Sequence, residues 1–295
     1  MPMVSHDESD RKRIDDLVSA YQLHPEFRDI YVEGQWDIRL IRWVLKGRGL
    51  HEVALYEIDA VHIPFNILAK HGLSEGKKER VVALANELQD KLSDSRQVTC
   101  ISDRDYDHLL GKNHSSPLLL MTDFSCQEAY LLNEHVFDKV IALVIRNYPF
   151  DSPRLIGELL PTLQELHLMR AANLSLRMNM EWLPFGKCCD YKAHTLHFRK
   201  DEYIERYLSK NGKLSQRDLF LAKLEELGGR LLPDARHHVS KLDLFCLLAE
   251  ILPSYCKEQA FHHPEYIARS LSACLEVTYL SEEPMYRQLL ARVKD

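Results

Sequence analysis

The chain lacks the features of a membrane, secreted or disulfide-bonded protein. No stretch approaches the ~18 uninterrupted apolar residues that a membrane helix requires. The N-terminal segment through Arg13 is polar and has no apolar signal core, so we expect a cytoplasmic protein without a membrane partner. The seven cysteines are scattered, and only Cys188 and Cys189 are adjacent. Because no Cys-x-x-Cys pair occurs, neither a zinc site nor a disulfide framework is predicted.

Two further absences limit the function. The formal net charge is -6, which excludes a globally basic surface for nucleic acid. A nucleic-acid enzyme would therefore rely on local basic patches or on a partner. No Gly-x-x-x-x-Gly-Lys-[Ser/Thr] nucleotide loop occurs, so the chain is not expected to bring an ATPase of its own.

The first half of the chain alternates strand and helix patterns. Strand patterns occur at 29–33, 53–58, 98–102 and 118–122, and helix patterns follow Glu33 and cover 77–92. This alternation predicts an α/β fold with a parallel sheet of about four strands and flanking helices. Beyond residue 153 the pattern is mainly helical, with a small hairpin possible at 185–198. We expect a helical lead-in over 1–27, an α/β domain over 28–148 and a helical domain over 149–295.

Carboxylates follow two of the predicted strands. Glu33 ends the first strand, and Asp103, Asp105 and Asp107 follow the third. The carboxyl ends of parallel strands border the crevice in which such folds bind ligands. Crowded carboxylates repel each other unless a cation lies between them, and the usual cation is Mg²⁺ (or Mn²⁺). The sequence therefore predicts metal-dependent phosphate chemistry, with the alternative that Glu33 caps the next helix and the acidic loop is simply solvated.

Five short motifs carry a resemblance to a known family. They are Glu33-Gly-x-x-Asp37, Tyr56-Glu-Ile-Asp59, the Gly76-Lys-Lys-Glu-Arg helix opening, Asp103-x-Asp105 and Thr122-Asp-Phe-Ser-Cys-Gln-Glu-Ala-Tyr130. The first and fourth resemble the Toprim motif of topoisomerases, primases and OLD-type nucleases. Roughly residues 28–145 are similar to a Toprim/OLD-like branch found in bacterial defence loci, which includes the Toprim effectors of PARIS anti-phage systems.

The resemblance implies a Toprim-like fold and a Mg²⁺-dependent nuclease that cleaves phosphodiester bonds in DNA or RNA, including tRNA. It also implies a homodimeric effector that works with a separate ATPase protein. In such an effector, 28–148 is the Toprim-like catalytic domain, and 149–295 supplies dimerisation, partner or substrate contacts. Glu33 becomes a metal ligand or the general acid/base, and Asp103 and Asp105 become metal ligands. Asp107 extends the ligand set, while Asp37 is a second acid or only orients the helix start.

Two further residues are assigned by the resemblance with alternatives open. An acid at Glu128 lies near the metal in the resembled branch, yet Ser125-x-x-Glu128 is also a helix capping box. OLD-type nucleases use a basic residue near the scissile phosphate. No motif identifies that residue here, and Lys112 is the nearest candidate in the sequence.

A basic stretch in the second half is a candidate nucleic-acid contact. Its candidate residues are Arg199, Lys200, Arg206 and Lys210. They alternate with Tyr203 and Tyr207, a composition suited to phosphate contact and base stacking. The alternative is an ordinary exposed helix.

Two other functions remain open at this level. One is a non-catalytic module that keeps the fold and docks a partner such as an ATPase. The other is a phosphotransfer or phosphatase domain, which requires a nucleophilic Asp with a placed Lys and Ser/Thr, a set that the motifs do not supply.

Overall fold

The computed structural model describes residues 11–92, 94, 96–145, 148–192, 194–255 and 258–294. The chain is an α/β protein in two compact units. The first unit comprises Met1–Arg104, Asn113–Asp123 and Glu276–Asp295, and the second comprises Asp105–Lys112 and Phe124–Leu275. This division differs from the boundary at residue 148 that we expected. Residues 1–10 of the expected lead-in lie outside the described residues.

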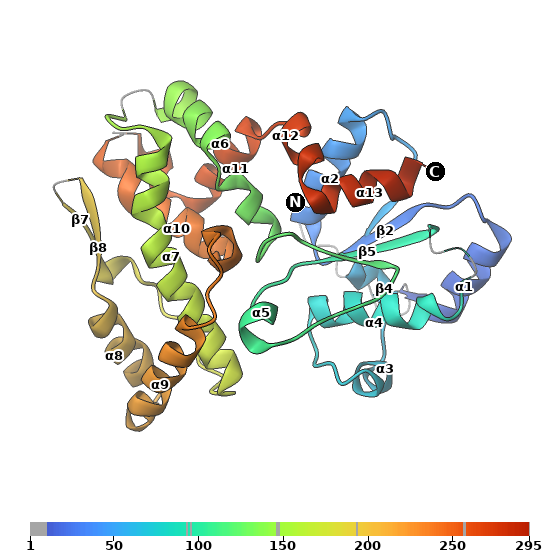
Figure 1. Cartoon of the computed structure of the whole chain (residues 1–295), viewed down its shortest axis with the longest axis horizontal. Coiled ribbons are helices and arrows are strands. Elements are labelled where there is room, and N and C mark those ends of the chain that lie inside the picture. Colours follow the sequence, from blue (N-terminus) through green and yellow to red (C-terminus); the bar gives the residue numbers. More distant parts are fainter. Residues whose placement is uncertain are drawn as a thin grey trace. The chain divides into compact units, whose positions relative to one another are not determined.

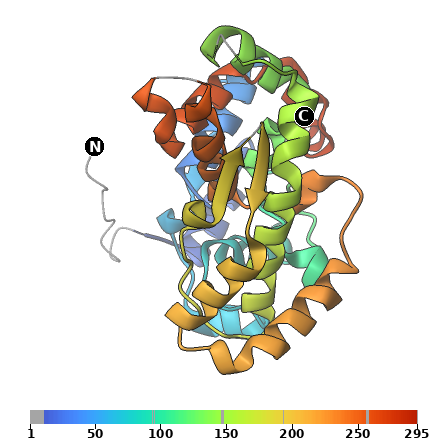
Figure 2. The same ribbon diagram turned by 90° about the vertical axis from the view of Figure 1, so that its left-hand side faces the viewer.

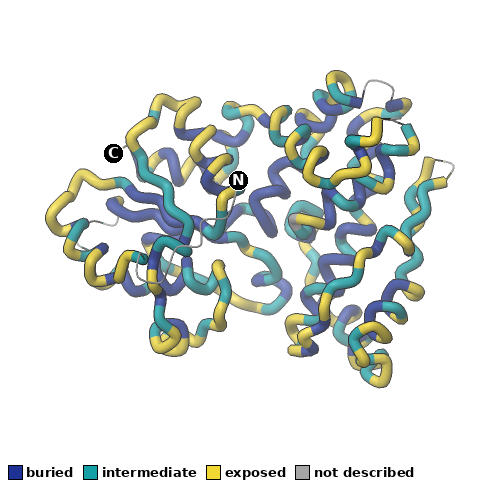
Figure 3. The backbone as a smooth tube through the Cα atoms, turned by 180° about the vertical axis from the view of Figure 1, so that it is seen from behind, coloured by how far each residue is buried: buried dark blue, intermediate teal, exposed yellow. Residues whose placement is uncertain are grey.

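The first unit contains a four-stranded parallel sheet in the order β3-β2-β5-β6. The strands are β2 (Asp29–Val32), β3 (Leu55–Glu57), β5 (Val98–Ser102) and β6 (Leu119–Met121). Every residue of β2 and β5 is buried, and Figure 3 shows these central strands as a continuous buried layer. Their nearly continuous apolar character is therefore that of strands covered on both faces. A second, two-stranded parallel sheet pairs β1 (Lys12–Arg13) with β4 (Val61–His62).

The strand order creates a topological switch point between β2 and β5. The chain leaves β2 for β3 on one side of the sheet and leaves β5 for β6 on the other side. The connections after these two adjacent strands therefore diverge at their carboxyl ends. In open α/β sheets, ligands bind outside the carboxyl ends of the strands at such a point.

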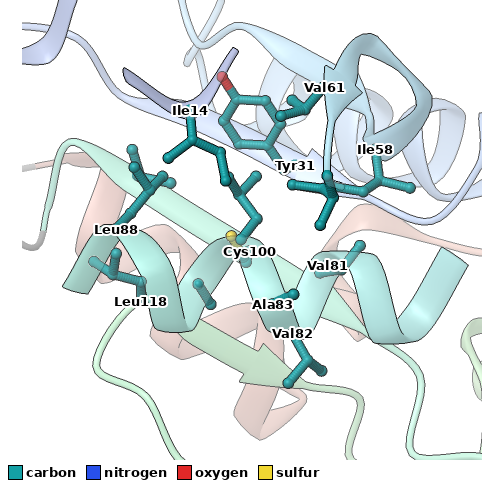
Figure 4. Packing of buried hydrophobic residues seen from close by; sticks show 14 of the residues in the cluster. Ile14, Tyr31, Ile58, Val61, Val81, Val82, Ala83, Leu88, Cys100 and Leu118 are labelled. Carbon is teal, nitrogen blue, oxygen red and sulfur yellow. The ribbon is translucent and has the colours of Figure 1, made fainter. Parts of the chain in front are cut away.

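Helices cover both faces of this sheet. They are α1 (Ile14–Leu23), α2 (Gln35–Gly47), α3 (Phe65–Lys70), α4 (Lys77–Gln89), α12 (Val277–Glu282) and α13 (Pro284–Lys294). Figure 1 shows α4 on one side of β2 and β5, and α2 and α13 on the other. The apolar side of α4 is buried: Val81 and Leu88 pack in one cluster with Cys100 of β5 and Tyr31 of β2 (Figure 4). Each such fully buried aliphatic side chain contributes about 1.5–3 kcal/mol.

The C-terminal helices belong to the first unit, and not to a continuous helical domain over 149–295. Asp123, which follows β6, accepts the backbone N–H of Met285 at the start of α13, at 3.1 and 3.0 Å from its two oxygens. Arg48 donates from Nε to Ser281 Oγ at 2.9 Å. The sequence shows the apolar face of such a helix but not the surface that the face covers, because that contact is non-local.

The second unit is mainly helical. Its elements are α5 (Asp107–Leu110), η3 (Gln127–Leu131), α6 (Glu134–Lys139), η4 (Val140–Ile145), α7 (Ser152–Ser175), η5 (Gly186–Cys188), β7 (Cys189–Lys192), β8 (Thr195–Phe198), α8 (Lys200–Lys210), η6 (Leu214–Gln216), α9 (Arg217–Gly228), η7 (Ala235–His238), α10 (Lys241–Ile251), η8 (Leu252–Ser254), η9 (Gln259–His262) and α11 (Pro264–Cys274). The predicted hairpin is confirmed as the antiparallel pair β7–β8, which Figure 2 shows beside the long helix α7. A bidentate ion pair joins α7 to α10, with Arg170 Nε and Nη2 2.8 and 2.7 Å from the Asp243 carboxylate.

No helix in the described part of the chain is both long enough and apolar enough to cross a bilayer.

Candidate active site

Glu33 lies at the switch point, directly after β2. Its Oε1 accepts a hydrogen bond from Ser102 Oγ at 2.7 Å and from the backbone N–H of Asp103 at 2.9 Å. Both donors are at the carboxyl end of β5, which is the neighbour of β2 in the sheet. The structure therefore brings Glu33 and Asp103 together at one edge of the sheet.

The segment that carries Asp103 is fixed from two more directions. Thr122, which follows β6, donates its N–H to Ser102 O at 3.0 Å. Its hydroxyl oxygen accepts the Arg104 N–H at 3.0 Å, and its carbonyl accepts Arg104 Nε at 2.5 Å. From α4, Lys78 donates its ammonium to Arg104 O at 2.8 Å. The backbone on both sides of Asp103 is thus held by neighbouring elements, which is the support that a precisely positioned site requires.

Lys78 is a basic residue beside Asp103 to which we assigned no role from the sequence. Lys112, our sequence candidate, belongs to the second unit, where its side chain is exposed and its N–H donates to Asp107 O at 2.8 Å. A signal for Lys78 was present in the sequence. Lys77 and Lys78 open α4, although the helix dipole disfavours cations in the first turn. Two lysines in the first turn of a helix depart from this preference, and such departures are expected at functional positions.

The start of α2 is stabilised by Asp37. Gly34 is the N-cap residue, and its backbone N–H donates to Asp37 Oδ2 at 3.0 Å. This hydrogen bond confirms that Asp37 orients the helix start, and its role as a second acid stays a prediction. The alternative that Glu33 caps this helix is wrong, because Gly34 occupies the cap position and Glu33 bonds to β5.

Carboxylates at the outer strand ends have visible structural roles. Glu57, the last residue of β3, accepts Gln35 Nε2 and lies 3.5 Å from Lys77 Nζ. Asp59 is 2.8 Å from Lys77 Nζ and 2.6 Å from Arg80 Nη1. Although burial raises the pKa of Asp59, hydrogen bonds and charge from Lys77 and Arg80 lower it overall. The acids beside the switch point are therefore Glu33 and Asp103.

Asp105 and Asp107, two of the remaining predicted ligands, belong to the second unit. Asp105 has a φ of 47°, a left-handed conformation that Asp tolerates better than most residues, and its N–H donates to Ser125 O at 2.7 Å. Asp107 is buried and is the first residue of α5. The backbone contact of Asp105 is thus a local structural role that does not depend on a metal.

Glu128 is fully buried in η3 of the second unit. The capping box that we considered for it is wrong. Cys126 is the N-cap residue of η3, and Ser125 donates from Oγ to Val239 O at 2.6 Å and from its N–H to Arg236 O at 3.4 Å. Ser125 therefore ties this segment to the segment that ends in Val239 and does not begin a helix.

The chemistry of the Glu33–Asp103 pair can be compared with the needs of a divalent cation. Within the described ranges, no group of three or more His, Cys, Asp or Glu side chains is arranged to hold a metal ion. Mg²⁺ usually takes only one or two carboxylates and completes its shell with water and substrate phosphate. Two hard oxygen donors on adjacent strand ends fit that mode.

The predicted nucleic-acid surface on α8 is largely neutralised. The ion pairs are Arg199 with Asp190 and Glu202, Lys200 with Glu165, Arg206 with Glu202, and Lys210 with Glu181. Tyr203 and Tyr207, which we expected to offer to bases, are fully buried. They lie four residues apart on one face of the helix, and that face packs inward beside Trp182. The geometry favours the alternative of an ordinary surface helix.

Comparison with protein-family models and with curated proteins finds no match for this chain.

Proposed function

We propose that the chain is a Mg²⁺- or Mn²⁺-dependent phosphodiesterase of the Toprim/OLD-like type that cleaves nucleic acid. One observation carries this proposal. Glu33 and Asp103 follow adjacent parallel strands at the switch point, and the Glu33 carboxylate accepts a hydrogen bond from the backbone N–H of Asp103.

The side chains divide into three roles. Glu33 and Asp103 would hold the cation, and Ser102 orients Glu33 through its hydroxyl. When bound, the cation would neutralise phosphate charge and lower the pKa of a water nucleophile. Lys78, whose ammonium is hydrogen-bonded beside Asp103, would bind the scissile phosphate. Asp105, Asp107 and Glu128 remain metal-ligand predictions from the sequence and its family resemblance.

The biological setting follows from the resemblance alone. We propose an effector of a bacterial anti-phage system that acts as a homodimer and is controlled by a partner ATPase. Its substrate is DNA or RNA, including tRNA. An ATPase encoded beside this chain's gene is the protein to test. We expect cells that express the chain alone to lose viability and cells that co-express this ATPase to survive; equal survival would contradict the arrangement.

The nuclease proposal is tested with the purified chain. Plasmid DNA, single-stranded DNA and total tRNA are incubated with Mg²⁺, Mn²⁺ or EDTA. We expect metal-dependent cleavage that Glu33→Gln and Asp103→Asn each reduce by about 100-fold or more, in line with the loss of a catalytic charge. Lys78→Met is expected to cost about tenfold to 100-fold.

Glu57→Gln is the matched control, because it neutralises an acid at the end of the neighbouring strand whose contacts are with Gln35 and Lys77. It should retain cleavage within about twofold. Full activity in both Glu33→Gln and Asp103→Asn would contradict the proposal. Metal binding by calorimetry without cleavage of any substrate would instead favour the non-catalytic docking module.

A further inference from the structure

A cleft of about 680 Å³ lies at the amino-terminal edge of the sheet, within the first unit. Asp29, the first residue of β2, lines it, and so does Ala54, which precedes β3. The walls come from α1, from Glu26–Arg28 and from Gly49–Val53. This is the edge opposite to the carboxyl ends that carry Glu33 and Asp103, so the cleft is separate from the proposed active site.

A buried carboxylate is available in this cleft. Asp29 is only 9% exposed, and its Oδ2 accepts the Tyr21 hydroxyl at 2.8 Å. The Tyr21 hydroxyl is also 2.9 Å from the Tyr31 hydroxyl, the oxygen visible at the end of the Tyr31 ring in Figure 4. No hydrogen bond from the residues that the structure describes reaches Asp29 Oδ1. Because burial raises the pKa of Asp29, a cation at Oδ1 would stabilise its charged form.

The chain already places one ammonium group in this cleft. Lys12 Nζ lies 4.4 Å from the centre of the Tyr56 ring, and its charge partly offsets the rise in the pKa of Asp29. The Tyr56 ring is supported by stacking on Tyr31 at 5.3 Å. The cleft thus combines an aromatic face with a carboxylate, which are the two groups that recognise organic cations. Lys12 itself is exposed, so a ligand can take its place.

The charges that face Asp29 select the sign of the ligand. The carboxylates of Glu26 and Glu52 line the cleft together with Asp29, and the cations are Lys12 and Arg28. The other titratable groups in the lining are His51, Tyr21 and Tyr56. Arg28 donates from Nη1 to the carbonyls of Pro25 and Phe27, at 3.0 and 2.9 Å, and is held to its own loop. One more carboxylate than cation disfavours a phosphate-bearing ligand and favours an ammonium.

The rim adds an apolar surface. Phe27 is 36% exposed, and its ring is supported by stacking on His24 at 4.7 Å. An aliphatic stem with ammonium groups at intervals can lie on such a ring while its charges meet separate carboxylates. We propose that this cleft binds a small aliphatic polyamine, with one ammonium group on Asp29 Oδ1 in competition with Lys12.

The test is calorimetric titration of the full chain with spermidine. We expect saturable binding of one molecule per chain, weakened about tenfold or more by Asp29→Asn, which keeps an oxygen for Tyr21 but loses the charge. Lys12→Ala should strengthen binding about threefold, because removal of an internal competitor raises the fraction of competent sites. Asp15→Asn neutralises an 80%-exposed acid on α1 and should change the affinity less than twofold.

Each result decides for or against the polyamine site. An equal loss in Asp29→Asn and Asp15→Asn would show general charge attraction and overturn it. Tighter binding of AMP than of spermidine would overturn it as well. If Asp29→Asn fails to fold, Lys12→Ala decides alone, and an unchanged or weaker affinity in that variant refutes the site. None of these outcomes depends on nuclease activity.

Discussion

The hydrogen bonds of Glu33 offer the sharpest test of how the carboxyl edge is held together. Glu33→Gln keeps one side-chain oxygen for the two donors but removes the charge. Glu33→Ala removes the acceptor completely and leaves the Ser102 hydroxyl and the Asp103 N–H without it. Ser102 is only 2% exposed, so water replaces the lost acceptor poorly.

The expected magnitudes follow from the geometry. A hydrogen bond to a charged group contributes about 1.5–3 kcal/mol, and the half-buried position of Glu33 places its two bonds at the low end. Glu33→Ala should therefore cost about 3 kcal/mol locally and Glu33→Gln about 1 kcal/mol. Since about 1.4 kcal/mol is a factor of ten, protection of the Asp103 amide against hydrogen exchange should fall about 100-fold and about fivefold, respectively.

Amide hydrogen exchange measured residue by residue is the assay. The Ile30 amide, which donates to Ala54 O at 2.9 Å on the same strand as Glu33, is the internal reference and should change little. Unchanged protection of the Asp103 amide in Glu33→Ala would refute the reasoning. A drop of the same size at Ile30 would show global destabilisation in place of the local loss.

Three further predictions concern stability. Asp243→Ala leaves Arg170 without its bidentate partner and should lower the free energy of unfolding by about 3–5 kcal/mol in urea denaturation, whereas an unaltered midpoint would contradict a stabilising role for the pair. Asp123→Ala removes the acceptor of the Met285 N–H and should lower the free energy of unfolding by about 1 kcal/mol, with faster hydrogen exchange of that amide. Equal protection of the Met285 amide in both proteins would argue against stabilisation of the start of α13 by Asp123. Burial, with nearby imidazole groups, holds the pKa of His167 well below its usual value, so the unfolded chain binds a proton that the folded chain excludes. Stability should therefore fall as the pH drops below about 6.5. His167→Gln should show a smaller decrease in urea midpoint between pH 7.5 and 5.5 than the unmodified chain, and an equal decrease in both proteins would contradict a role for His167.

Local structure was largely readable from the sequence. The strand predicted at 98–102 is confirmed as Val98–Ser102, and the helix predicted from Lys77 begins at that residue. The hairpin within 185–198 is also confirmed. These elements depend on the spacing of apolar residues and on turn residues nearby in the chain, and that information is local.

The site was only partly readable. The acids at strand ends place the candidate site at one edge of the sheet, because parallel strands have their carboxyl ends together. The contact of Lys78 with Arg104 depends on the packing of α4 against β5, and the burial of Tyr203 depends on which face of α8 turns inward. The capping box predicted from Ser125 was wrong, because the Ser125 hydroxyl donates to the carbonyls of Arg236 and Val239, which are more than 100 residues away in the chain.

The sequence by itself determined the α/β class, the parallel strands and the acids that follow them, because periodicity and residue type act within a few neighbouring residues. Only the tertiary structure decided the strand order that places Glu33 beside Asp103 at a switch point. It alone assigned α12 and α13 to the first unit and revealed the Asp29 cleft. These features depend on contacts between segments far apart in the chain. Such contacts stabilise the fold only when the chain has brought the apolar surfaces together, so they cannot be inferred from neighbouring residues.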